Sequence, residues 1–200
     1  MDIITLYLHI MTNRTKTCSV QNVGNLQAFS RYLPPGPDAL AWGLHILDAG
    51  YTHIPADSPY PPAKHPDGYM FTWQRGRVLS EYQMVYITRG SGSFESRKAG
   101  KREIGAGDVF LLFPGGWHRY RPDPSTGWDE HWIGFSGSYA EQVMSHFFPA
   151  NEPVLHVGHD ETLLQQFQSV AEMMQSAPPG YRQMMAADTV AALARVRGLA

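Results

Sequence analysis

His118 is the residue whose type and setting most directly suggest chemistry, because a neutral imidazole is a common metal ligand. It follows an apolar run and a Pro114-Gly115-Gly116 turn. Catalytic zinc or iron needs three or four ligands. The chain contains no His-x-His pair and one cysteine, Cys18. We therefore expect no metal and no cofactor. We interpret His118 as a hydrogen-bonded histidine at the barrel rim rather than a metal ligand, and it remains a candidate for contact with a small-molecule ligand.

Short strands must position this histidine. The strongest strand signal is Tyr82 to Thr88, which is β-branched and aromatic, and the Arg89–Gly92 turn leads to a partner strand at 93–97. Further strand candidates, separated by Gly and Pro turns, follow as far as Trp128 to Phe135. This even spacing is typical of a small antiparallel barrel or jelly roll.

After Gly137 the apolar spacing changes from two to about 3.6, which predicts helices. We expect a short helix at 138–148 and a second helix opened by Asp160 as N-cap, with a third from Tyr181 to about Val196. The apolar stripes of the last two must be buried against the barrel or a second copy of the chain. The two stripes carry more apolar side chains than one small barrel can cover, and we therefore predict a homodimer formed through these helices.

The chain divides into three parts by these signals. Residues 1–37 end in a Pro and Gly cluster and are predicted to be an irregular leader or arm. Residues 38–137 form the predicted barrel, with a possible strand at Ala39–Leu47 and a proline-rich loop from Pro55 to Pro66. Residues 138–200 form the helical segment. The fold class expected is mainly β, a jelly-roll barrel followed by two or three α-helices.

Composition narrows the functional classes. The formal net charge is −2, with 18 acidic and 16 basic residues, which argues against nucleic-acid binding by this chain itself. No apolar run reaches the roughly 18 residues of a membrane span, so we expect no membrane partner. The first eleven residues carry an early Asp2 and no cleavage-site pattern, which argues against export. We expect a cytoplasmic protein.

Gly107 to His118, a Gly-Asp turn followed by an apolar strand and a Pro-Gly turn, resembles the second conserved motif of cupin barrels. Cupin enzymes also carry a first motif of the H-x-H…E type, which supplies most of the metal ligands and is missing here. The resemblance implies a cupin-like fold (a double-stranded β-helix) without enzymatic activity. A metal-dependent cupin enzyme, an isomerase or dioxygenase, remains an alternative, as does a stand-alone sugar-binding cupin.

Three segments together resemble the sensor domain of AraC-type (AraC/XylS) transcription regulators. They are Tyr82–Gly92, Ala106–Tyr120 and Trp128–Phe135, the last leading into a helix. The resemblance covers about residues 50–196. It implies a small-molecule effector, a sugar or another compound, and dimerisation through the helices that follow the barrel. It also implies that DNA is bound by a separate C-terminal helix-turn-helix domain, which is absent from these 200 residues.

The same resemblance implies a ligand site. The family's pocket arginine corresponds to Arg75 or Arg77, its tyrosine to Tyr120 and its tryptophan to Trp132. A family histidine falls on Glu130, with His131 beside it. An aromatic face and charged groups suit a sugar; a monosaccharide, an oligosaccharide fragment or a uronic acid all fit.

The structural alternatives for these residues stay open. Trp132 can equally be a core residue, Arg75 and Arg77 can be surface charges, and Tyr120 can point inward only together with His118. If the effector enters the barrel, we expect it to order the arm or the proline-rich loop over the mouth.

Overall fold

The computed structural model describes residues 21–23, 26–61 and 71–200. Its strands are β1 (Gln21–Val23), β2 (Leu26–Tyr32), β3 (His45–Ile54), β4 (Arg77–Val78), β5 (Tyr82–Ser96), β6 (Gly100–Gly105), β7 (Asp108–Leu112), β8 (Trp117–Pro122), β9 (Trp128–Ser136) and β10 (Val154–His156). Its helices are α2 (Pro37–Ala41), α3 (Ser138–Phe147), α4 (Glu161–Ser176) and α5 (Tyr181–Leu199).

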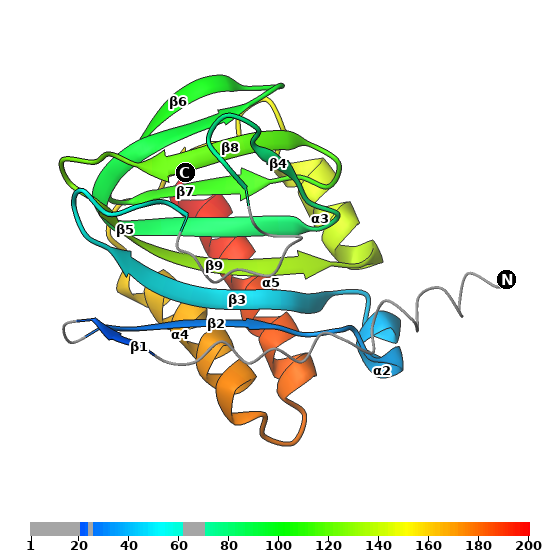
Figure 1. Cartoon of the computed structure of the whole chain (residues 1–200). Helices are drawn as coiled ribbons and strands as arrows, with labels where there is room; N and C mark the ends of the chain where they lie inside the picture. Colours follow the sequence, from blue (N-terminus) through cyan, green and yellow to red (C-terminus); the bar gives the residue numbers. More distant parts are fainter. Residues whose placement is uncertain (1–20, 24–25, 62–70) are drawn as a thin grey trace, which may run out of the picture.

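The strands form two antiparallel layers that share β5 (Figure 1). The larger layer has the order β1-β2-β3-β9-β5-β7-β10, and the smaller one joins β4, β8, β5 and β6. The expected mainly β jelly roll followed by helices is confirmed. Among the described strands, however, the sheet does not close, because β1 and β10 lie at opposite ends of the larger layer.

The long strand β5 bends from one layer to the other. Residues 82–90 pair with β9, whereas 91–96 pair with β6 and β8. The pairing with β9 shifts register between Ile87 and Arg89, and Gly90 has φ +83°. A Cβ at Gly90 would lie 2.0 Å from the carbonyl oxygen of Gly127, so the bend needs glycine.

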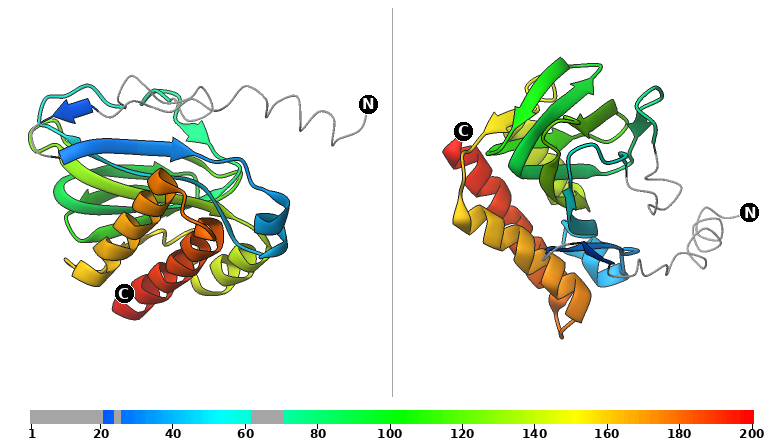
Figure 2. Two further views of the ribbon diagram at one scale, coloured as in Figure 1. Left: turned by 90° about the horizontal axis from the view of Figure 1, so that it is seen from below. Right: turned by 60° about the vertical axis from the view of Figure 1, so that its left-hand side comes forward.

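The helices cover the outer face of the larger layer, as the views in Figure 2 show. The buried side of α4 includes Leu163, Phe167 and Val170, and that of α5 includes Leu193 and Val196. They share one core with residues of the larger layer. The apolar stripes are therefore buried within the chain, so the reason given for a dimer is wrong, and the dimer itself stays a prediction.

A second core lies between the two layers. Because successive side chains of a strand point to opposite faces, the strands β3, β9, β5 and β7 of the larger layer each contribute side chains to both cores. On β9, Trp128 and Trp132 face the second core, whereas Ile133 and Phe135 face the helices. On β7, Phe110 and Leu112 face the second core, and its other face packs toward the helices. The predicted apolar strand after Gly107 is apolar on both faces because each face meets a core.

The N-terminal part differs from the prediction in two places. The segment 1–37, predicted to be irregular, contains β2, which pairs with β3 along Phe29–Tyr32; its residues 1–20 and 24–25 lie outside the described ones. β2 forms a strand because the edge of β3 offers unpaired backbone groups for hydrogen bonding, and the sequence of β2 itself shows no alternating pattern. The strand predicted at Ala39–Leu47 is wrong in its first half, where α2 begins with Pro37, a residue favoured in the first helical turn.

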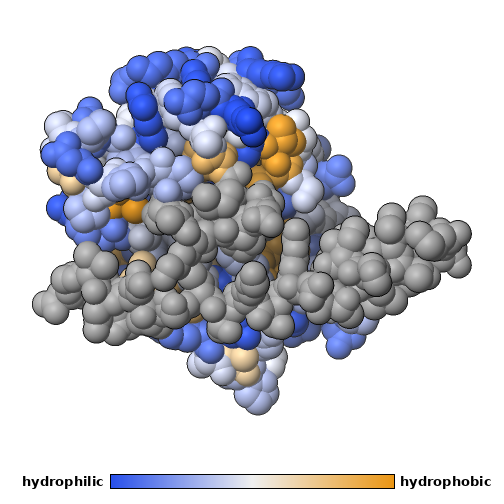
Figure 3. Space-filling model, in the orientation of Figure 1, coloured by the Kyte–Doolittle hydropathy of each residue, from blue (hydrophilic) through white to orange (hydrophobic). Residues whose placement is uncertain are grey.

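Hydrophilic side chains gather over the smaller layer, around β6 and β8 (Figure 3). Of the helices described, none is both long enough and apolar enough to cross a membrane.

Candidate functional site

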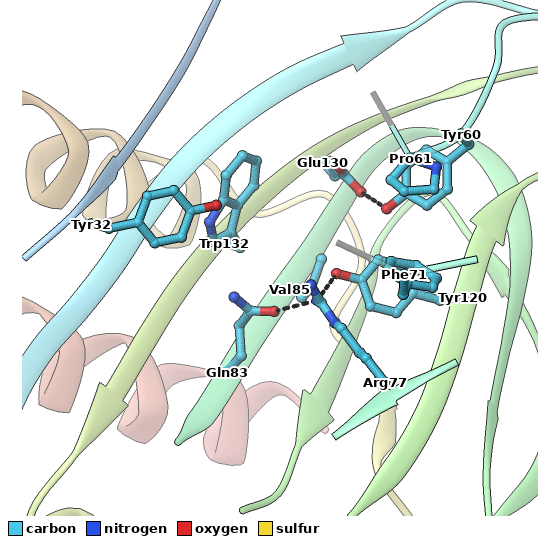
Figure 4. A pocket seen from close by; sticks show the side chains of 10 residues that line it. All are labelled: Tyr32, Tyr60, Pro61, Phe71, Arg77, Gln83, Val85, Tyr120, Glu130 and Trp132. Atoms are coloured by element: carbon cyan, nitrogen blue, oxygen red, sulfur yellow. Dashed lines mark hydrogen bonds between the residues drawn. The ribbon is translucent and has the colours of Figure 1, made fainter. Parts of the chain in front are cut away.

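A small cavity lies between the two layers (Figure 4). Strands of the larger layer contribute five of its ten lining residues, and β8, β4 and three loop residues complete it. The lining residues are Tyr32, Tyr60, Pro61, Phe71, Arg77, Gln83, Val85, Tyr120, Glu130 and Trp132.

Arg77 is the centre of the polar contacts. It lies on the two-residue strand β4, which pairs with the start of β8, so that Arg77 is opposite His118. Its guanidinium donates to the Gln83 side-chain oxygen (3.2 Å), to the Tyr120 hydroxyl and to Nε2 of His118 (3.2 Å). Its charge also lies over the rings of Phe71, at 5.0 Å, and Tyr120, at 5.2 Å. Three acceptors and two aromatic faces hold this cation in one orientation.

Gln83 connects Arg77 to a buried carboxylate. Its amide nitrogen donates to Oδ1 of Asp48 at 2.9 Å, while its oxygen accepts from Arg77. Asp48 is fully buried and Gln83 is almost fully buried. Gln83 has the same strand parity as Val85, so a polar side chain interrupts the apolar inner face of β5.

Glu130 occupies the opposite wall and accepts a hydrogen bond from the Tyr60 hydroxyl at 3.1 Å. Burial raises the pKa of Glu130 to about 7, although the Tyr60 hydrogen bond and the Arg77 charge oppose the rise. Burial likewise raises the pKa of Tyr120 to about 12, against the lowering effect of Arg77. Near neutral pH the Glu130 carboxyl can therefore exchange a proton, whereas Tyr120 keeps its hydroxyl hydrogen.

His118 is held as a neutral imidazole behind Arg77. Its Nδ1 donates to the carbonyl oxygen of Gly116 at 2.9 Å, and its Nε2 accepts from Arg77. Burial, together with the Arg77 charge, lowers its pKa to about 3. Both ring nitrogens are thus engaged within the protein. Within the described ranges, no group of three His, Cys, Asp or Glu side chains could hold a metal ion.

Aromatic rings form the rest of the wall. The Trp132 ring crosses β3 at Gly50, where a Cβ would lie 2.4 Å from the ring. Glycine at position 50 therefore allows the indole to lie against the backbone of β3. Tyr60 packs against Phe71 and Tyr120, with ring centroids 6.2 and 6.1 Å apart.

The cavity itself measures only about 20 Å³, which is room for about one water molecule. Ligand pockets for small molecules typically measure about 300–1,000 Å³. Tyr60 and Phe71, two of the described residues between β3 and β4, line this small cavity, and both pack against Tyr120. As folded, the cavity has no room for a ligand much larger than a water molecule.

Most of the residues predicted for the site are brought together. Tyr120, Glu130 and Trp132 line the cavity, and His118 contacts it through Arg77. Of the two candidate arginines, Arg77 lines the cavity, whereas the Arg75 side chain is exposed to solvent. Tyr120 and His118 do point inward together while Arg119 binds Glu95 outside. Their role in ligand binding stays a prediction.

Seven contributors were not predicted: Tyr32, Asp48, Tyr60, Pro61, Phe71, Gln83 and Val85. Gln83 could have been found, because it is a polar residue within the strongest apolar strand signal. Tyr60 and Pro61 belong to the proline-rich loop that was expected near the mouth, part of which (62–66) lies outside the described residues. The other four carry no local signal that separates them from ordinary strand or loop residues.

Comparison with known proteins agrees with this architecture. A family model described as "AraC-like ligand binding domain" matches residues 61–187, more than half of the chain. The chain belongs to this family of AraC-like ligand-binding domains. The match includes the inner faces of β4, β5, β8 and β9, and therefore Arg77, Tyr120, Glu130 and Trp132.

Two curated relatives are regulatory proteins. The raffinose operon transcriptional regulatory protein RafR of Pediococcus pentosaceus is 31% identical over 74 residues, covering 37% of this chain and 27% of the relative. The Msm operon regulatory protein of Streptococcus mutans is 27% identical over 95 residues, covering 48% and 34%. The matched part is about a third or less of each relative's length.

Solved structures with a similar arrangement of strands include cupins. The cupin domain of Schizosaccharomyces pombe Cnp3 has a TM-score of 0.36 at 13% identity, covering 62% of this chain and 72% of that one. The Escherichia coli protein YhaK has a TM-score of 0.39 at 10% identity, covering 55% and 44%.

Proposed function

We propose that this ligand-binding domain is the effector-sensing and dimerisation part of an AraC-type transcription regulator, and that its effector is a carbohydrate or a related small molecule. The observation that carries the proposal is the half-buried Arg77, which is held between Gln83 and Tyr120 and faces aromatic rings. A guanidinium and an amide suit bidentate hydrogen bonds to hydroxyls, and an indole suits the C–H face of a sugar ring. The name of one relative, a raffinose operon transcriptional regulatory protein, supports the same ligand class.

Effector binding requires Tyr60 and Phe71 to leave the cavity. A sugar cannot enter about 20 Å³, so the closed state and the sugar-bound state must differ in the positions of the Tyr60 and Phe71 side chains. The ligand then shifts the population toward the open state by its differential affinity. We propose that the displacement of these two side chains is the conformational signal that the sensor transmits.

The test is a titration of the 200-residue chain with raffinose, its component sugars and a uronic acid, followed by thermal unfolding and calorimetry. A ligand at about 100 times its Kd stabilises the folded state by about 2.7 kcal/mol, a shift of several degrees. We expect Arg77→Met to weaken binding at least tenfold. The matched control is Arg75→Met, two residues away and exposed, which should leave the Kd within a factor of two.

Equal losses in the two variants, or stabilisation by a divalent metal that a chelator reverses, would contradict the proposal. The second result would favour a metal-dependent cupin enzyme over a sensor.

The remaining parts of the proposal concern partners. We propose that DNA is contacted only through a further domain outside these residues, that the protein acts in the cytoplasm, and that the chain forms a homodimer through residues 138–200. Exposed Tyr139, Phe147 and Met184 in that segment support the dimer. Sedimentation across a wide range of concentrations tests it, and a monomer throughout would contradict it.

A further inference from the structure

A second and larger cleft opens beside the first cavity. It lies where β5 and β7 end and β8 begins, and the loop between α3 and β10 closes it with Ala150 and Pro153. Its volume is about 310 Å³, which is within the range of small-molecule sites. Unlike the Arg77 cavity, this cleft needs no side chain to move before a ligand can enter.

The walls of the cleft are apolar on one side and cationic on the other. Phe113 and Trp117, both half-buried, provide the accessible apolar surface, because Phe94 and Leu112, which also line the cleft, are each only 1% exposed. Arg97 and Lys98, from the turn between β5 and β6, provide the cations. No acidic residue lines the cleft, and among the described residues neither cation has a carboxylate within ion-pair distance. Two adjacent positive charges beside an apolar wall favour an organic anion.

The cleft extends into an adjoining hollow. That hollow shares Lys98, Phe113, Pro114 and Ala150 with the cleft. Lys98 therefore stands where the two meet, and a ligand longer than the cleft has a path outward past its charge.

His118 separates the cleft from the Arg77 cavity. Its ring lines the cleft, while its Nε2 accepts from Arg77 on the other side. The two sites are thus connected through the hydrogen bond between His118 and Arg77, but they share no lining residue: Arg77 does not line the cleft, and Arg97 and Lys98 do not line the cavity.

We propose that this cleft binds a small organic carboxylate with an apolar body, such as an aromatic acid, whose ring packs on Phe113 and Trp117 and whose carboxylate meets Arg97 and Lys98. This site is independent of the proposed sugar site and does not depend on Tyr60 or Phe71 moving.

The test titrates the whole 200-residue chain with benzoate, phenylacetate and indole-3-acetate, each beside its neutral amide, by calorimetry and by chemical-shift changes. We expect at least one acid to bind at least tenfold more tightly than its amide. Lys98→Met and Arg97→Met should each weaken that acid about fivefold or more. The matched control is Arg102→Met, an exposed cation on β6 whose guanidinium donates only to the backbone of Lys101, and it should change the Kd less than twofold.

One further variant and one further readout keep the result interpretable. Ala150→Trp, on a loop that lines the cleft, should abolish acid binding while thermal unfolding stays cooperative. Lys98→Met should keep its sugar affinity within a factor of two of the wild type, because Lys98 does not line the Arg77 cavity, so loss of sugar binding and loss of acid binding separate the two proposals. Absence of binding by all three acids, equal affinity for acid and amide, or equal loss in Arg102→Met would overturn the proposal.

Discussion

The protonation of Glu130 gives the sharpest test of how the site is built. Its folded-state pKa of about 7 compares with an ordinary value of 4.5. Since the folded state holds this proton more tightly than the unfolded state, Glu130 favours folding at low pH. That contribution is fully present below about pH 4.5 and is lost as the pH rises through 7. One pKa unit is worth about 1.4 kcal/mol, so the change is about 3 kcal/mol.

Two buried histidines impose the opposite trend. The pKa of His118 is lowered to about 3, and burial lowers that of His131 to about 4. Because their folded-state pKa values lie below the ordinary 6.5, these histidines contribute to folding stability fully above pH 6.5, and this contribution is lost as the pH falls toward 4 and 3. The stability of the wild type alone therefore cannot isolate Glu130, and a difference between two proteins must be measured.

The perturbation is Glu130→Gln, which keeps the shape and an oxygen that accepts from the Tyr60 hydroxyl but does not titrate. Urea unfolding of both proteins from pH 4 to pH 8 gives the free energy of unfolding of each. We expect the variant to gain about 3 kcal/mol relative to the wild type between pH 4.5 and pH 7.5, with little change at either end. Glu152→Gln, at an exposed loop position, is the control and should show no such pH-dependent difference.

A difference that stays constant across this range would refute the reasoning. It would mean that Glu130 ionises as in water, and hence that Tyr60 and Phe71 do not close the cavity.

Three further changes test other parts of the structure. Tyr60→Ala should destabilise the fold by about 3–5 kcal/mol yet raise effector affinity at least tenfold, because it removes the side chain that fills the site; urea unfolding and calorimetry measure the two, and unchanged affinity would exclude displacement. Gly50→Ala places a Cβ 2.4 Å from the Trp132 ring and should cost about 1–3 kcal/mol, a loss absent in Gly36→Ala, where nothing lies within 4 Å. Asp160→Ala removes the N-cap acceptor of the Leu163 amide and should lower unfolding stability by about 1 kcal/mol, whereas Asp160→Asn should retain most of it.

The order of strands and helices could be predicted because their signals are local. The β-branched run at Tyr82–Thr88 and the turns after it mark strands by residue type alone. Asp160 marks the start of α4, and its side chain does accept from the Leu163 amide at 2.7 Å. By contrast, β2 is a strand because it pairs with β3, and pairing of this kind depends on contacts distant in sequence.

The site residues were predicted from the resemblance to AraC-type sensor domains, which indicated Tyr120, Glu130 and Trp132. Alternation along the strand added that Tyr120 and His118 must point to the same side. Arg75 and Arg77 could not be distinguished, because a two-residue strand provides too little alternation to set a register. Tyr60 and Phe71 reach the cavity through a loop. Their positions follow from packing against Tyr120, which no local pattern encodes.

The contacts that Tyr60 makes also indicate what can replace it. Its ring packs against aromatic side chains, and its hydroxyl satisfies the buried carboxyl of Glu130. A ligand that displaced the ring without supplying a hydroxyl would leave Glu130 without its partner, at a cost of about 1–3 kcal/mol or more for a charged group. A sugar has both an apolar C–H face for Trp132 and hydroxyls for Glu130 and Arg77. The residue that closes the site thus imposes on any effector the same combination of ring and hydroxyl that it has itself, which favours a polyhydroxylated ring over a purely apolar ligand.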